Sequence, residues 1–422
     1  MRNSTSPDPK ADVTTPAIQR TLDAVWRIES ARIVATLAKM TGDIGVAEDL
    51  AQEALLDALT QWPESGVPDN PGAWLTAVGK RKAIDSWRRR ERLDDRYRAI
   101  AQNLKETTED EWQPIPDDVL RLIFIACHPV LSREGQVALT LRTVGGLTTE
   151  EIARMLLIPV ATVQQRIVRA KKTLAAAKVP FDTLEPAEWG ARLNAVLGVL
   201  YLIFTEGYAA TTGNRWIRTE VANEALRLGR VLAGLLPREP EVHGLLALME
   251  FQASRFAARV NNDGSPILLP DQNRARWDRT QIGRGAAALK SADSVGRGRG
   301  NYCLQAAIAQ CHATAPSFEE TDWQKIVVLY EALARLAPGP VVELNYAVAV
   351  SMATGPAAAL KIVDRLVSDG NLQRSHLLPS IRGELLSKLG RIDEARAELL
   401  QAAELTANDQ QKAVLLAKAA SL

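Results

Sequence analysis

The segment Leu147–Leu174, LTTEEIARMLLIPVATVQQRIVRAKKTL, constrains the fold more than any other part of the chain. Thr148 or Thr149 can cap a short helix with acidic residues in its first turn, and Pro159 ends that helix and sets a turn. A second helix begins near Val160, with apolar residues at helical spacing. We therefore predict a helix-turn-helix. The apolar stripe of its second helix consists of Val163, Ile167, Ala170 and Leu174.

The outward face of this second helix carries hydrogen-bond donors and no acidic residue. In a helix-turn-helix, the N-terminal part of the second helix meets base edges in the major groove, and basic residues farther along meet phosphates. A single helix with basic residues outside is more often merely solvated, but two consecutive capped helices joined by this turn favour DNA binding. The predicted contact residues are Thr162, Gln164, Gln165, Arg166, Arg169, Lys171 and Lys172.

A second basic segment, Asn70–Arg92, precedes the helix-turn-helix and has the sequence NPGAWLTAVGKRKAIDSWRRRER. Positive charge neutralises phosphates, and flat aromatic faces stack on unpaired bases, so this mixture suits a single strand or a melted duplex. The alternative is a basic helix with two core tryptophans. The candidate residues are Trp74, Lys80, Arg81, Lys82, Trp87, Arg88, Arg89 and Arg90.

An acidic stripe lies further upstream, in the segment Asp43–Leu59, DIGVAEDLAQEALLDAL. Asp49, Glu53 and Asp57 recur every four residues, beside an apolar stripe of the same helix. Like charges at this spacing repel each other, and a basic partner surface would relieve that cost. We therefore expect the acidic stripe to face a protein.

Taken in order and spacing, these three motifs resemble the RNA polymerase sigma factors of the extracytoplasmic-function group. The resemblance covers roughly residues 18 to 178 and implies that Asp49, Gln52 and Glu53, with Asp57 on the same stripe, contact the clamp helices of bacterial core RNA polymerase. It further implies that the loop Pro63–Pro71 holds a flipped base of the minus-10 element. The basic helix after Trp74 would follow the melted strand, and the second helix of the helix-turn-helix would read the minus-35 element.

Gln164 and Gln165 stand where this group usually has a small or basic pair, so the resemblance carries no promoter sequence over to this chain. The domain organisation that we predict is all-α. It comprises a disordered tail at 1–17, a region 2 domain at 18–95, an acidic linker at 96–117, a region 4 domain at 118–178, a helical extension at 184–295 and helical repeats at 300–422.

The final segment resembles tetratricopeptide (TPR) repeats. Gly383–Leu405 has small and apolar residues at the positions where two helices of a pair cross, and Ala347, Gly355 and Ala359 echo this pattern about 35 residues earlier. Stacked helix pairs present a concave surface that commonly holds a protein or peptide ligand. A plain helical bundle is the alternative.

Two other parts of the extension stand out. Asp271–Asp278 surrounds Trp277 with alternating charges and reads as a helix start or as a functional contact. The glycine-rich Gly296–Gly300 reads as a joint between helices, because its spacing does not match a phosphate-binding loop.

Composition adds mainly exclusions. The chain has 422 residues, 46% hydrophobic and 24% charged, and a net charge of +1, which indicates a globular protein with several cores. Three cysteines form no disulfide framework, so we expect a reducing cytoplasm; Cys303, Cys311 and His312 match no zinc pattern. We expect no metal, no cofactor, no membrane span and no enzymatic site.

The sequence therefore predicts a sigma factor that directs promoter-specific transcription initiation and that a C-terminal helical extension regulates. One alternative is a helix-turn-helix regulator that binds operators and senses a ligand through its repeats. Another is a repeat scaffold whose N-terminal half is no longer active in transcription. The acidic stripe separates the first reading from both, because an operator-binding regulator needs no surface for polymerase.

Overall fold

The computed structural model describes residues 9–90, 116–156, 158–179, 186–208, 219–261, 265–373, 375–406 and 408–422. Within these ranges the protein is helical, and an isolated bridge pairs Val260 with Pro266. The predicted all-α fold is thus confirmed. The chain divides into two compact units, Met1–Val199 and Leu200–Leu422.

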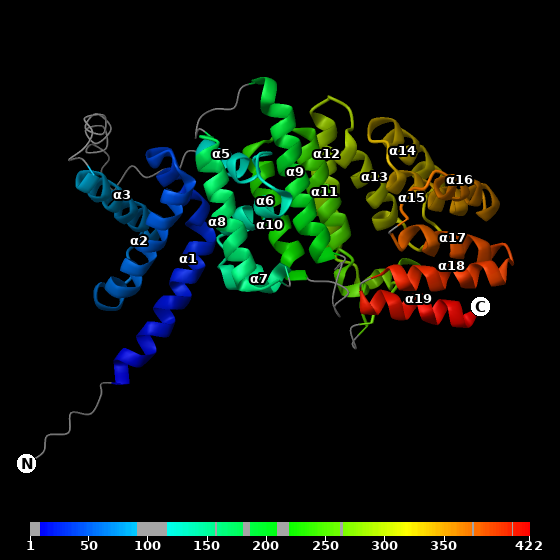
Figure 1. The fold of residues 1–422 in the computed structure, drawn as a ribbon, viewed down its shortest axis with the longest axis horizontal. Helices are drawn as coiled ribbons and strands as arrows, with labels where there is room; N and C mark the ends of the chain where they lie inside the picture. The colour runs from blue at the N-terminus through cyan, green and yellow to red at the C-terminus, as the bar shows by residue number, and fades with distance from the viewer. Residues whose placement is uncertain are drawn as a thin grey trace, which may run out of the picture. The chain divides into compact units, whose positions relative to one another are not determined.

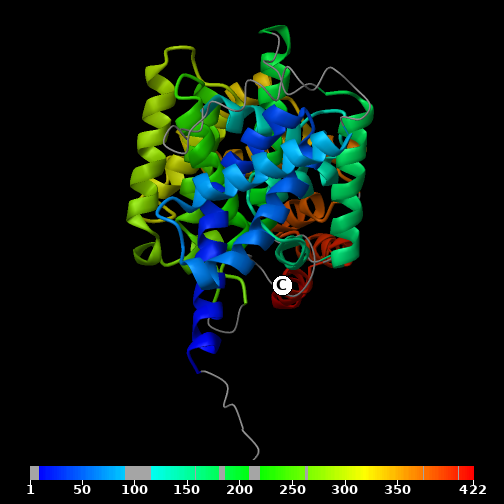
Figure 2. The ribbon, with the colours of Figure 1, turned by 90° about the vertical axis from the view of Figure 1, so that its left-hand side faces the viewer.

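The first unit begins with three helices that pack against one another (Figures 1 and 2). Asp43 caps the second of them by accepting the backbone N–H groups of Gly45 and Val46. The buried side chains of Trp62 and Leu75 lie in their shared core. The helices are α1 (Pro9–Thr41), α2 (Ile44–Ser65) and α3 (Pro71–Arg90).

Two boundaries differ from those expected. Helix α1 begins at Pro9, before the expected boundary at residue 18, because a formed helix extends readily by one bond per residue. Helix α2 continues through Pro63, so the expected loop Pro63–Pro71 begins only at Gly66, which has a φ of 81°. Pro63 lacks the N–H group for one helical hydrogen bond and crowds the carbonyl four residues earlier, which weakens the last turn, and Gly66 follows at the end of the helix.

Four further helices complete the described part that precedes the extension. Thr148 caps α7. Its hydroxyl oxygen accepts a hydrogen bond from the backbone N–H of Glu151 at 3.1 Å, and the Glu151 carboxylate accepts one from the backbone N–H of Thr148 at 2.9 Å. Pro159 precedes the first residue of α8. The helices are α5 (Pro116–Ala126), α6 (Arg133–Thr143), α7 (Thr149–Leu156) and α8 (Val160–Ala176).

The predicted apolar stripe of α8 is buried at all four of its positions, so the helix-turn-helix prediction is confirmed in its packing. Residues 96–115 of the expected acidic linker lie outside the described residues. Its last two positions, 116 and 117, belong to α5, which begins at Pro116. Residues 1–8 of the expected tail also lie outside them. Helix α9 (Pro186–Tyr208) spans the boundary between the two units.

The second unit continues with helices around a core that includes Phe251 and Cys303. Asp278 caps α12 by accepting the N–H groups of Thr280 and Gln281, so Asp271–Asp278 is the helix start that its pattern suggests. Gly296–Gly300 joins α12 to α13. The helices are α10 (Thr219–Leu235), α11 (Pro240–Ala253), α12 (Arg279–Ser294) and α13 (Asn301–Thr314), with short 3-10 helices at Phe256–Ala258, Leu269–Asp271 and Arg274–Arg276.

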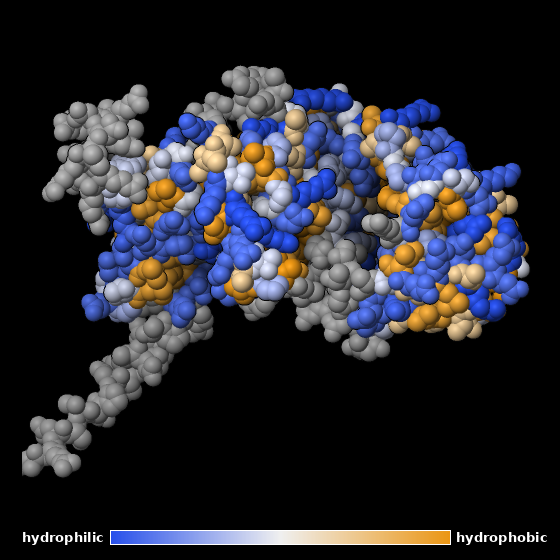
Figure 3. Space-filling view, in the orientation of Figure 1, coloured by the Kyte–Doolittle hydropathy of each residue, from blue (hydrophilic) through white to orange (hydrophobic). Residues whose placement is uncertain are grey.

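The last part of the unit consists of helices in which each packs on the next along the chain, and its surface mixes hydrophobic with hydrophilic patches (Figures 1 and 3). A Cβ on Gly383 would lie 3.1 Å from the carbonyl oxygen of Ala395, so α17 and α18 cross closely where the repeat pattern places small residues. The helices are α14 (Trp323–Leu336), α15 (Pro340–Ala353), α16 (Pro356–Ser368), α17 (Leu377–Lys388), α18 (Ile392–Leu405) and α19 (Asp409–Ser421).

Candidate nucleic-acid interface

The acidic stripe of α2 lies beside the basic helix α3. Lys82 of α3 places its Nζ 3.0 Å from an Asp57 oxygen and 3.6 Å from a Glu53 oxygen. The Lys82 ammonium lies between two carboxylates and reduces the repulsion between them. The sequence led us to expect a basic surface of a partner protein to do this, and part of that effect is supplied within the unit itself. The Asp49 side chain is 75% exposed and the Glu53 side chain 56% exposed, which leaves both accessible. Gln52 is partly buried.

The buried carboxylate of Glu48 joins α2 to the helix-turn-helix. Glu48 is 4% exposed, and its Oε1 accepts from the Arg142 Nε of α6 at 2.6 Å. Its Oε2 pairs with the Lys171 Nζ of α8, and that ammonium also donates to Asp49 Oδ1 at 3.3 Å. Lys171, predicted to touch DNA, and Asp49, predicted to touch polymerase, therefore pair with each other in this conformation.

Electrostatics keep this buried carboxyl ionised. Burial by itself raises the pKa of Glu48, but the charges of Arg142 and Lys171 outweigh burial and hold the pKa below its usual 4.5. None of the three sequence motifs singles out Glu48 or Arg142. The sequence does contain one indication that Glu48 is buried: it lies one turn after Ile44, at a position of α2 that belongs to the apolar stripe. A carboxylate at such a position indicates a buried ion pair without identifying its partners.

The two tryptophans of the basic helix are both partly buried. The Trp74 ring packs edge-on against the buried ring of Trp62, with centroids 5.5 Å apart. Trp87 lies nearer the C-terminal end of α3. The Trp74 ring is thus packed against the core of the three-helix part. This agrees with the alternative interpretation of the basic segment, in which its tryptophans are core residues and do not stack on bases.

The basic residues of α3 point in different directions. Arg81 is exposed, whereas Lys82 faces the acidic stripe. Lys80 is partly buried, and burial lowers the pKa of its ammonium group. The backbone of Arg88–Arg90 ends α3, and the side chains of these residues lie outside the described part of the chain.

Helix α8 presents most of its predicted reading face to solvent. Its N-terminal half is free of acidic residues, and the helix begins directly after the proline turn. Such an outward row of amides and cations can donate hydrogen bonds to bases and phosphates. Gln164, Gln165, Arg169 and Lys172 are exposed, Thr162 and Arg166 are partly buried, and Lys171 lies at the contact with α2.

The beginning of the extension also packs within the first unit. Trp189 of α9 lies against Phe124 of α5, with ring centroids 5.1 Å apart. Phe124 is buried. The segment that follows the helix-turn-helix is therefore in aromatic contact with the same domain.

The cysteines and arginine-glycine segments have structural roles. Burial raises the pKa of the Cys303 thiol to about 12, which leaves it unreactive at neutral pH. Among the described residues, no group of three or more His, Cys, Asp or Glu side chains could hold a metal ion.

In the glycine joint Gly296–Gly300, both arginines form ion pairs. Arg299 binds Asp293 through two hydrogen bonds of 2.8 Å, and Arg297 pairs with Glu239. No described helix has the length and apolar character that a membrane crossing needs.

Comparison with known protein families matches three parts of the chain in order. Residues 27–93 match sigma-70 region 2, and residues 121–174 match sigma-70 region 4. Residues 192–293 match a family described as of unknown function, DUF6596. The first two ranges contain the acidic stripe, the basic helix and the helix-turn-helix.

Similar proteins agree with these matches. An uncharacterized protein of Rhizobium meliloti is 42% identical over 387 residues, which cover 88% of this chain and 89% of that protein. The Mycobacterium tuberculosis proteins named ECF RNA polymerase sigma factor SigL and probable ECF RNA polymerase sigma factor SigI are 31% and 29% identical over 32% and 40% of this chain. The matched parts cover 76% of SigL and 58% of SigI. No solved structure matches the chain.

These findings define the class: the chain belongs to the sigma-70 family of RNA polymerase sigma factors. Within that family it belongs with the extracytoplasmic-function sigma factors, and it continues beyond region 4 into a long helical extension.

Proposed function

We propose that this protein binds bacterial core RNA polymerase, directs it to specific promoters and is regulated by its C-terminal extension. The observation that carries the proposal is the succession of a region 2 match with an exposed acidic stripe and a region 4 match with an outward-facing basic helix. An operator-binding regulator would account for the second feature and not for the first.

The proposed division of labour assigns each surface one partner. The α2 residues Asp49, Gln52, Glu53 and Asp57 would contact polymerase, and α3 with the loop after Ser65 would contact the melted minus-10 strand. Helix α8 would read the minus-35 element. Because the Lys171 ammonium pairs with Glu48 and Asp49, promoter binding through Lys171 would require this contact between α2 and α8 to open.

Run-off transcription with purified core polymerase on genomic fragments tests the proposed function directly. We expect the full chain to produce discrete transcripts that core polymerase alone does not produce. Absence of such transcripts, together with footprinting of the protein on DNA without polymerase, would favour the operator-binding alternative instead.

Promoter reading by α8 gives a first prediction. We expect Gln165→Ala or Arg166→Ala to change the preferred upstream hexamer and to cost about 1 to 3 kcal/mol per lost base contact. Lys172→Ala, the matched control on the same helix, should weaken all sequences alike and flatten the salt dependence. Selection from a random promoter library measures the preference. The same selected bases for all three variants would contradict the assignment.

The contact between Trp189 and Phe124 gives a second prediction, on regulation. Trp189→Ala in the full chain should lower the free energy of unfolding by about 1 to 2 kcal/mol, because the aromatic contact with Phe124 is lost. It should also change the transcription rate severalfold if the extension acts through region 4. Leu202→Ala, at an exposed position of the same helix, is the matched control.

A chain that ends at Lys178 provides a second arm of this test. Circular dichroism first establishes that the shortened protein is folded. If both Trp189→Ala and the shortened protein transcribe the same promoters at the wild-type rate, the extension has no regulatory role through this contact.

A further inference from the structure

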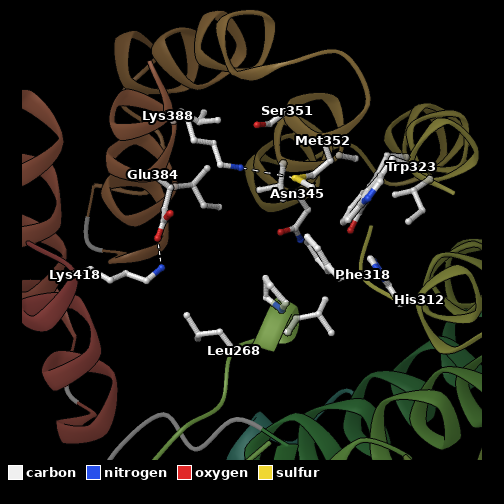
Figure 4. A pocket seen from close by; sticks show the side chains of 18 residues that line it. Leu268, His312, Phe318, Trp323, Asn345, Ser351, Met352, Glu384, Lys388 and Lys418 are labelled. Atoms are coloured by element: carbon white, nitrogen blue, oxygen red, sulfur yellow. Dashed lines mark hydrogen bonds and ion pairs between the residues drawn. The ribbon is translucent and has the colours of Figure 1, made fainter. Parts of the chain in front are cut away.

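The second unit contains a cavity that no part of the proposed function uses. Its volume is about 360 Å³, at the lower end of the range for small-molecule sites. Helices α13, α14, α15, α17 and α19 line it, together with the turn Leu268–Pro270 (Figure 4). Residues that are far apart in the sequence thus enclose one hollow within the unit.

One wall of the cavity is aromatic. The Trp323 ring meets the His312 ring edge-on at 5.2 Å and the Phe318 ring edge-on at 5.3 Å. These three side chains lie together on one side of the cavity in Figure 4. Ile326 and Tyr330 extend the same wall. A surface of this kind favours a flat ring, because aromatic pairs gain energy beyond the area that they bury.

Three buried polar atoms among the lining residues have no hydrogen-bond partner within the described part of the chain. Ser351 is 8% exposed, and its hydroxyl makes no hydrogen bond with the described residues. The same holds for the buried Nδ1 of His312 and the buried Nε1 of Trp323. Burial, followed by the charges of Arg255 and Arg274, lowers the pKa of His312 to about 4, so its ring is neutral at neutral pH. Because these atoms are themselves buried, they add an unfavourable free-energy term to the wall of the cavity but do not present a hydrogen-bonding group to its interior.

Two lysines and one carboxylate, Lys388, Lys418 and Glu384, lie on the opposite side, and Lys388 is exposed at its edge (Figure 4). Glu384 and Lys418 pair with each other and cancel. Lys388 has no recorded carboxylate partner among the described residues; its Nζ lies 3.8 Å from the thioether sulfur of Met352, a weak acceptor. The Asn345 amide lines the cavity as well. An anionic group would complement this side.

The turn at Leu268–Pro270 is held firmly against the rest of the unit. Arg274, just after it, donates to the carbonyl oxygen of Ala315 at 3.0 Å and also to that of His312. Gln272 donates to the carbonyl oxygen of Ile267 at 3.0 Å. The turn is therefore a fixed part of the wall of a cavity that remains partly open to solvent.

We propose that this cavity binds a small aromatic monocarboxylate, with its ring against Phe318 and Trp323 and its carboxylate toward Lys388. The volume of about 360 Å³ favours a free small molecule over a peptide. The inference goes beyond promoter-directed transcription and does not depend on it.

Isothermal titration calorimetry of the full chain tests the proposal, with indoleacetate and phenylacetate as probes. Indoleacetamide and phenylacetamide are the neutral matched compounds. We expect at least one acid to bind with one-to-one stoichiometry and its amide to bind at least about tenfold more weakly, because a charge-assisted contact is lost. A peptide that ends in a free aromatic residue is the third probe.

Two variants locate the site. Lys388→Met should weaken binding of the acid about tenfold and leave binding of the amide unchanged, whereas Lys361→Met, on the exposed face of α16, should change neither. Val348→Trp should abolish binding by filling the cavity, with thermal unfolding as the check that the unit is folded. Absence of binding by both acids, equal binding of acid and amide, tighter binding of the peptide than of either acid, or full affinity in Lys388→Met would each overturn the proposal.

Discussion

Replacing Asp49 and Glu53 by Lys is expected to weaken association with core RNA polymerase by about 3 kcal/mol, roughly 100-fold, since like charges would then face a partner surface suited to acids. Both side chains are more than half exposed, so their pairs with Lys171 and Lys82 contribute little to stability and the fold should remain intact. Co-purification with core polymerase and a fluorescence titration measure the effect.

Glu404→Lys is the control for this charge reversal, because it reverses an exposed acid on α18 of the second unit, outside the region 2 match. It should bind core polymerase as the wild type does. If the double variant also bound with wild-type affinity while circular dichroism showed an unchanged helical content, the acidic stripe would not be the polymerase contact.

Replacing Glu48 by Gln is expected to have the largest effect on stability, about 3 to 5 kcal/mol, because it leaves two cations without their buried partner. The Arg142 and Lys171 side chains are only 15% and 18% exposed, so water replaces the lost carboxylate poorly. Urea unfolding of the full chain measures the loss. Glu64→Gln, at an exposed position of α2, should leave the unfolding midpoint unchanged.

The same variant should separate α2 from α8. A spectroscopic distance between labels on α3 and α8 should lengthen in Glu48→Gln, because Arg142 and Lys171 are the recorded ion-pair partners of the Glu48 carboxylate. An unchanged distance and an unchanged urea midpoint would show that this ion-pair cluster does not hold the two domains together.

Acid should weaken the wild-type contact in a defined direction. The pKa of Glu48 is lower in the folded protein than its usual 4.5, so the contribution of this carboxyl is fully present above pH 4.5 and is lost as the pH falls below it. Glu48→Gln should lose that component of the pH dependence, since an amide does not titrate in this range.

The sequence by itself determined the local elements and the family. Thr148 with Glu151, the proline before Val160 and the four-residue stripe of α8 are short-range signals, because caps and helical periodicity depend on residues within one or two turns. The close crossing at Gly383 followed in the same way from the repeat pattern. The region 2 and region 4 matches agree with the order of motifs seen in the sequence.

Only the tertiary structure decided which charges meet. Lys171 and Asp49 are assigned to different partners by their motifs, yet they pair across 122 positions of sequence. The cavity likewise combines Leu268 with Lys388, which share no motif. Periodicity fixes the face of a helix on which a side chain lies, whereas packing between helices fixes what that face touches, and such long-range contacts leave no fixed spacing in the sequence.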